Sequence, residues 1–99
     1  MNNYENIYIL KGSLTEEQAK NEIEKIKEYY KNVIIYKKEN DINGFIGLKN
    51  LAYEVKKEKT GYYYITYFKG TEEQTSKINL KLKDNNNVIK FITIRINEE

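Results

Sequence analysis

The chain has 99 residues, with 17 Lys and Arg against 15 Asp and Glu, a net charge of +2, and it contains no His and no Cys. This length suits a single domain, residues 1–99. The absent residue types exclude an imidazole base, a thiolate nucleophile and a soft-metal site, so we expect no enzyme, no metal and no other cofactor. The five glycines are scattered and form no phosphate-binding loop, so no small-molecule substrate is indicated.

The start of the chain and its hydropathy bear on location. Residues 1–5 (MNNYE) lack the basic and apolar segments of a signal peptide. No apolar run approaches the ~20 residues that a membrane helix needs. We therefore expect a soluble cytoplasmic protein with no membrane partner.

The first part of the chain predicts a strand and then a helix. Residues 4–10 (YENIYIL) are rich in strand-forming residues. Thr15 followed by Gln18 is the signature of a helix capping box. Apolar residues then recur at helical spacing, which predicts a helix over residues 15–31.

A second strand and a hairpin follow. Residues 33–38 (VIIYKK) predict the strand, and Asn43-Gly44 indicates a turn after it. We interpret residues 48–56 as this strand continuing beyond the turn or bulge. Residues 57–61 predict another turn.

The last part of the chain predicts the pattern strand, helix, strand again. Residues 62–69 (YYYITYFK) are the strongest strand signal, and TEEQ from Thr71 repeats the capping signature of a short helix that ends near Lys83. Residues 88–96 (VIKFITIRI) predict the final strand. The order βαββαβ predicts an α+β domain of the ferredoxin-like, split βαβ kind, a four-stranded antiparallel sheet with both helices on one face.

The strands of this predicted sheet are apolar on both sides. A sheet with one wet face normally alternates apolar and polar residues. Since two helices cover only one face, the other should present a contiguous apolar patch, and such patches mark binding surfaces. Tyr and Lys are interleaved along 36–38, 53–59 and 62–63. Tyrosines stack on unpaired bases and lysines contact phosphate, so the partner is a protein or an RNA.

Residues 47–56 (GLKNLAYEVK) resemble a family signature, that of the sixth protein of the bacterial small ribosomal subunit, ribosomal protein S-six. The signature reads Gly, any residue, basic, polar or charged, Leu, Ala or Ser, Tyr, any residue, Ile, and then basic or small polar. Val55 stands here in the place of Ile. The resemblance extends to LTEEQ at 14–18, to Gly61-Tyr62 and to the strand order, so it covers the whole chain.

The resemblance implies a structural constituent of the small ribosomal subunit. Proteins of this family pair with ribosomal protein S-eighteen, and the pair binds the central domain of the small-subunit ribosomal RNA. The RNA contacts that it implies, with Lys and Arg on phosphate and Tyr on base or sugar, are Tyr4, Lys49, Tyr53, Lys56, Lys90 and Arg95. The face that it turns toward the partner protein consists of Ile7, Ile9, Tyr63, Ile65, Tyr67, Ile92 and Ile94. For Tyr53, a purely packing role in its strand is the alternative.

Three features depart from the family pattern. Asn2 and Asn3 stand where basic residues are frequent, which argues against an RNA contact at the N-terminus. Asn6 stands where an apolar residue usually faces the helices. The hairpin at 40–46 is longer than usual.

An RNA-recognition motif has the same element order and is the alternative interpretation. Residues 7–9 and 61–67 resemble its two strand motifs. That interpretation turns Tyr8, Tyr62 and Tyr64 toward the open face, whereas the ribosomal one turns them toward the helices and exposes Ile7, Ile9, Tyr63 and Ile65. A shift of one residue swaps faces, so the placement of Tyr64 against Tyr63 distinguishes the two. The alternative leaves the segment 47–56 unexplained.

Overall fold

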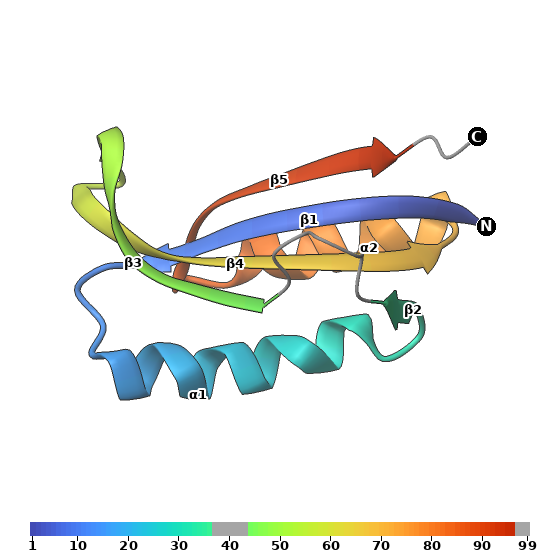
Figure 1. The fold of residues 1–99 in the computed structure, drawn as a ribbon, viewed down its shortest axis with the longest axis horizontal. Coiled ribbons are helices and arrows are strands. Elements are labelled where there is room, and N and C mark those ends of the chain that lie inside the picture. The colour runs from blue at the N-terminus through green and yellow to red at the C-terminus, as the bar shows by residue number, and fades with distance from the viewer. Residues whose placement is uncertain (37–43, 97–99) are drawn as a thin grey trace.

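The computed structural model describes residues 1–36 and 44–96, and within them two α-helices and one 3₁₀ helix pack on an antiparallel sheet (Figure 1). The expected turn at Asn43-Gly44 and most of the 40–46 hairpin fall outside these ranges. The predicted strand 88–96 is confirmed in full. The elements are β1 (Asn2–Lys11), α1 (Glu16–Ile26), η1 (Lys27–Tyr30), β2 (Ile34–Tyr36), β3 (Gly44–Val55), β4 (Glu58–Gly70), α2 (Glu72–Asp84) and β5 (Val88–Ile96).

The sheet has the order β2–β4–β1–β5, and β3 also pairs with β4. β2 pairs with residues 67–69 of β4, and β3 pairs with residues 58–65, so the two lie one after the other along the same edge of β4. The α+β class and the order βαββαβ are confirmed. The four predicted strand positions are filled by five strand segments, because the second position is shared between β2 and β3.

Both α-helices begin at a capping box, as predicted. The Thr15 hydroxyl accepts a hydrogen bond from the Gln18 backbone N–H, and the Gln18 side chain accepts one from the Thr15 backbone N–H; the same box opens α2 at Thr71. The first helix ends earlier than predicted, since α1 stops at Ile26 and η1 continues to Tyr30. Aromatic residues lose side-chain freedom in an α-helix, and a tighter 3₁₀ turn is frequent at a helix end.

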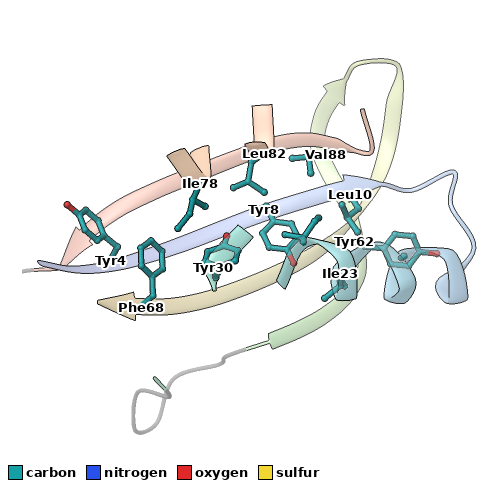
Figure 2. Packing of buried hydrophobic residues seen from close by; sticks show 12 residues of the cluster. Tyr4, Tyr8, Leu10, Ile23, Tyr30, Tyr62, Phe68, Ile78, Leu82 and Val88 are labelled. Carbon is teal, nitrogen blue, oxygen red and sulfur yellow. The ribbon is translucent and has the colours of Figure 1, made fainter. Parts of the chain in front are cut away.

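One cluster of buried side chains lies between the sheet and both helices (Figure 2). Tyr8 and Tyr62 are buried in it, and Tyr64 packs against it and stacks on Tyr8 with ring centroids 5.2 Å apart. Tyr63 and Ile65 point to the opposite face, because successive residues of a strand alternate. Tyr63 and Tyr64 are both half-buried, so their packing partners decide between the two registers. The register is the one predicted from the ribosomal resemblance, not that of the RNA-recognition motif.

This core contains one fully buried amide, that of Asn6. Its side chain is 0% exposed, and its Nδ2 donates a hydrogen bond of 3.2 Å to the Tyr30 hydroxyl. Within the described part of the chain, Asn6 Oδ1 has no hydrogen-bond donor. Burial raises the pKa of Tyr30 far above its ordinary value, and the hydrogen bond from Asn6 opposes this only in part. Asn6 and Tyr30 therefore form an uncharged pair in which one hydrogen bond is made and the Asn6 carbonyl lacks a donor among the described residues.

The β3–β4 hairpin turns at Lys56 and Lys57, so the prediction of a turn over 57–61 is wrong. Val55 pairs with Glu58, which leaves a two-residue loop whose φ angles are 48° and 67°. Tight hairpins favour such positive φ values because the twist of the loop then matches that of the strands. Lysine has no special preference for this conformation, so the sequence carried no sign of the turn.

Candidate functional site

The seven residues predicted to face a partner protein lie on the sheet face away from the helices. In the part of the chain that the structure describes, no helix covers this face. The strand registers arrange it as three cross-strand rows, each read from β4 through β1 to β5. These rows, which we call the bare sheet face, are Tyr67, Glu5 and Ile94; Ile65, Ile7 and Ile92; and Tyr63, Ile9 and Lys90.

Exposure varies across the bare sheet face. Ile92 and Ile94, on the edge strand β5, are 42% and 44% exposed. Tyr67 is buried, because it lies beside the Tyr36 ring and its hydroxyl donates a 3.3 Å hydrogen bond to Glu5. Ile9 is also buried, so the expectation that it is exposed is wrong. The accessible apolar surface is concentrated on β5 and in the middle row.

The β3–β4 hairpin covers Ile9. Regular pairing is interrupted at residues 51–54 of β3, which stand opposite Lys59 alone, and bulges of this kind re-aim side chains. Gly61 lets the β4 backbone pass close to the Ile9 side chain, because a Cβ at Gly61 would lie 2.3 Å from Ile9 Cγ2. The hairpin and the sheet together enclose a hollow of about 210 Å³, which we call the hairpin hollow. It is lined by Ile9, Leu51, Ala52, Tyr53, Val55, Tyr63 and Lys90.

Four of the six predicted RNA contacts lie on or beside this hairpin. Lys49, Tyr53 and Lys56 belong to the hairpin itself, and all three are exposed. Tyr53 is 69% exposed, so the alternative that it is a packed strand residue is wrong. Lys90 reaches over from β5, with its Nζ 5.6 Å from the centroid of the Tyr53 ring, which is a cation–π arrangement.

A second hollow, of about 250 Å³, lies next to the first, and Lys90 lines both. We call it the lysine hollow because Lys56, Lys83 and Lys90 line it and no carboxylate of residues 1–36 and 44–96 does. The other lining residues are Leu82, Val88, Ile89 and Phe91. Sequence reasoning missed Lys83. A lysine in the last turn of a helix is explained by the helix dipole, and only the fold brings the end of α2 beside β5 and the hairpin.

The two remaining predicted RNA contacts lie elsewhere. Tyr4 is 5% exposed and stacks on Phe68 in the core, with ring centroids 5.5 Å apart, so its ring is not available to a base and the prediction is corrected. Arg95 is exposed on the side of the helices, where it donates a 2.8 Å hydrogen bond to Asn2 Oδ1 and lies 3.8 Å from the Glu72 carboxylate. The contact of Arg95 with RNA stays a prediction, and Arg95 does not lie with the four predicted contacts at the hairpin.

Shifted pKa values occur in the core and at the end of α1. Burial raises the pKa of Tyr8 and Tyr30 in the core, and a hydrogen bond to Glu24 raises the pKa of the exposed Lys27. Residues 1–36 and 44–96 contain no group of three or more acidic, His or Cys residues that could hold a metal ion. In these same ranges, neither α-helix is long and apolar enough to cross a membrane. The arrangement at the surface is suited to binding.

Two helices on one side of an antiparallel sheet define a protein of the ferredoxin-like class, and the apolar face on the other side is a surface of the kind that often marks a binding site. The chain belongs to the family of ribosomal protein S6, whose sequence profile matches residues 3–95. This confirms the resemblance found at residues 47–56.

The relatives are similar over nearly all of this chain. The small ribosomal subunit protein bS6 of Helicobacter acinonychis is 40% identical over 101 residues, which cover 96% of this chain and 65% of that protein. That of Sulfurovum sp. is 38% identical over 95 residues and is covered to 72%. The chain thus spans 65% of the length of its Helicobacter acinonychis relative. The crystal structure of 30S ribosomal protein S6 from Thermotoga maritima has the same fold, with a TM-score of 0.82 at 23% identity, covering 96% of this chain and 87% of that one.

Proposed function

We propose that this chain is a non-catalytic structural constituent of the small subunit of the cytoplasmic bacterial ribosome. In this role it binds the central domain of the small-subunit ribosomal RNA together with ribosomal protein S-eighteen. Membership of the ribosomal protein S6 family supports the ribosomal assignment. One observation supports separate surfaces for the protein and the RNA: one sheet face is apolar and bare, and the lysines lie at the hairpin beside it.

The first two rows of the bare sheet face, those of Tyr67 and of Ile65, are the proposed contact with the partner protein; the third row, which the hairpin covers at Ile9, is not needed for it. Full burial of an isoleucine side chain contributes about 1.5–3 kcal/mol, so covering the exposed parts of Ile92 and Ile94 contributes about 1 kcal/mol for each. An aspartate at either position would place an unpaired charge in the interface, which costs more than the lost apolar contact. Single changes on β5 therefore test this contact strongly.

The hairpin is the proposed contact with RNA. Each phosphate that a lysine neutralises releases counterions, so this part of the binding weakens steeply as the salt concentration rises. Lys49, Lys56 and Lys90 are exposed, and within residues 1–36 and 44–96 none of the three forms an ion pair, which leaves their charges available to phosphate.

The first experiment is affinity purification of the tagged chain from its native cells under gentle, low-salt lysis. We expect small ribosomal subunits to be recovered with it. Recovery of the free chain alone would overturn the ribosomal assignment.

The second experiment compares Ile92→Asp with Leu80→Asp in binding to purified ribosomal protein S-eighteen. Leu80 is 59% exposed on α2, away from the bare sheet face, so it is a matched control. We expect Ile92→Asp to weaken binding at least tenfold with unchanged stability, and Leu80→Asp to have little effect on binding. Equal effects of the two changes would show that the bare sheet face is not the contact.

A further inference from the structure

The hairpin hollow combines two aromatic rings with a single charge. Tyr53 and Tyr63 stand among the aliphatic side chains of its wall, and among the described residues Lys90 is the only charged one that lines it. Its volume of about 210 Å³ is below the ~300–1,000 Å³ of sites for drug-sized ligands and corresponds to about seven water molecules. A single planar ring system suits both the size and the walls.

The adjoining lysine hollow has the complementary chemistry. Lys56, Lys83 and Lys90 come from the hairpin turn, α2 and β5, and all three line this hollow. A compact anion with several acceptor oxygens, such as phosphate, satisfies such a group of ammonium donors. Because Lys90 lines both hollows, the two hollows adjoin. A ligand that fills both must therefore have its ring system and its anionic group close together.

We propose that the two hollows together bind one unpaired nucleotide of an RNA strand. Its base lies in the hairpin hollow against the tyrosines, and its phosphate lies in the lysine hollow. This inference rests on the proposed binding of RNA and adds the chemical group that each hollow takes. It also assigns Lys83 to the RNA-binding surface, although Lys83 lies outside the family signature at residues 47–56.

The charge of Lys90 favours a nucleotide over a protein side chain as the occupant. An apolar side chain seated in the hairpin hollow would cover Lys90 without an anion to pair with it, and burying an unpaired ammonium is costly. A nucleotide brings its own phosphate. Base stacking on an aromatic ring is tolerant of sequence, since every base has a π-face, so the site should accept different bases.

The experiment uses the full chain and two five-nucleotide single-stranded RNAs, one of uridines and one with the same sugar-phosphate backbone in which all five positions are abasic. Methyl NMR signals of Ile9, Leu51 and Val55 report on the hairpin hollow, and fluorescence anisotropy gives the affinity. We expect the intact RNA to shift these signals and to bind about tenfold or more tightly than the abasic RNA. Equal affinities, or unshifted methyl signals, would overturn the base site. Equally tight binding of uridine monophosphate would overturn RNA as the source of the nucleotide.

Two matched pairs of variants separate the base from the phosphate. We expect Tyr53→Leu, which keeps apolar volume but loses the ring, to weaken binding about tenfold, and Tyr53→Phe to stay within about twofold of the unchanged chain. We expect Lys83→Gln to reduce the slope of log affinity against log salt by about 0.7, the value for one phosphate of a single strand. Lys31→Gln removes another exposed charge, just after η1, and should leave the slope unchanged. Equal slopes for the two lysine variants would overturn the phosphate site.

Failure of this inference is distinguishable from failure of the proposed function. If the chain is recovered with small subunits but the pentamer leaves the hollow signals unshifted, the nucleotide site is wrong and the ribosomal role stands. If the pentamer shifts those signals but small subunits are not recovered, the site stands without that role. Hollow signals that respond to ribosomal protein S-eighteen and not to RNA would assign the hairpin to the protein interface instead.

Discussion

Replacing Asn6 by leucine should stabilise the protein. Leucine has the branching and the number of side-chain heavy atoms of asparagine, although its methyl groups are bulkier than the amide. The site is 0% exposed, so the change broadly keeps the shape of the side chain and makes the position apolar. A buried carbonyl without a donor costs about 1–3 kcal/mol, whereas the lost hydrogen bond to Tyr30 is worth about 0.5–1.5 kcal/mol. The apolar burial of leucine adds to the gain. We expect the free energy of unfolding to rise by about 1–2 kcal/mol.

A double-mutant cycle with Tyr30→Phe tests the physical reason. Tyr30→Phe alone removes the acceptor of Asn6 Nδ2 and leaves the whole amide buried without a partner, so it should destabilise by about 1–2 kcal/mol. In the Asn6→Leu background, the same change removes a hydroxyl that has already lost Asn6 as its donor, and it should be nearly neutral. The difference, about 1–2 kcal/mol, measures the coupling of the two side chains.

Urea unfolding followed by far-ultraviolet circular dichroism provides the measurement. With an m value of about 1–2 kcal/mol/M, the stabilisation shifts the midpoint by about 1 M, and the melting temperature rises by about 4–8 °C for each kcal/mol. An unchanged m value is the control that the denatured state is the same. If Asn6→Leu lowers the stability by about 1 kcal/mol or more, or if the cycle shows no coupling between Asn6 and Tyr30, the reasoning is refuted.

Three further predictions concern the buried phenols, the hairpin turn and the helix caps. Burial raises the pKa of Tyr8 and Tyr30, so above pH ~10 the unfolded chain loses phenolic protons that the folded chain keeps; the free energy of unfolding should then fall by up to about 1.4 kcal/mol per pH unit for each phenol. Urea titrations from pH 9 to pH 11.5 measure this fall, and a flat profile would contradict it. Lys57 has a φ of 67°, so Lys57→Gly should raise the stability by about 0.5–1 kcal/mol in thermal melts, whereas Lys57→Val should lower it. Because Thr71 and Thr15 cap their helices with the same box, Thr71→Ala and Thr15→Ala should each cost about 1 kcal/mol in urea unfolding, and a neutral effect of both would disprove the capping role.

Local signals in the sequence were sufficient for the elements. A capping box acts within four residues, so Thr15 and Thr71 located both helix starts correctly. Long β-rich runs with few breakers located β1, β4 and β5. The helix end at Ile26 and the turn at Lys56 and Lys57 were missed, because both depend on backbone conformations for which these residue types have no distinctive preference.

The sequence also determined the class of surface, though not its shape. Strands apolar on both sides, with only two helices to cover them, require a bare face whatever the details of packing. The segment 47–56 identified the family and so selected the register that turns Tyr8 and Tyr62 inward. Which residues of the bare face stay accessible was not predictable, since Ile9 is covered by a hairpin that lies more than 40 residues away in the chain.

Tertiary structure alone decided how the candidate RNA contacts are grouped. Tyr4 and Lys49 are equally good candidates by residue type, yet the pairing of β1 with β4 places the Tyr4 ring on Phe68 in the core. Lys56, Lys83 and Lys90 come from a hairpin, a helix end and an edge strand, and no local pattern links them. Their meeting depends on strand register and on the bulge at 51–54, which are set by packing across the whole sheet. The sequence by itself thus determined a two-sided sheet of the ribosomal protein S6 family, and the fold decided which side chains share a site.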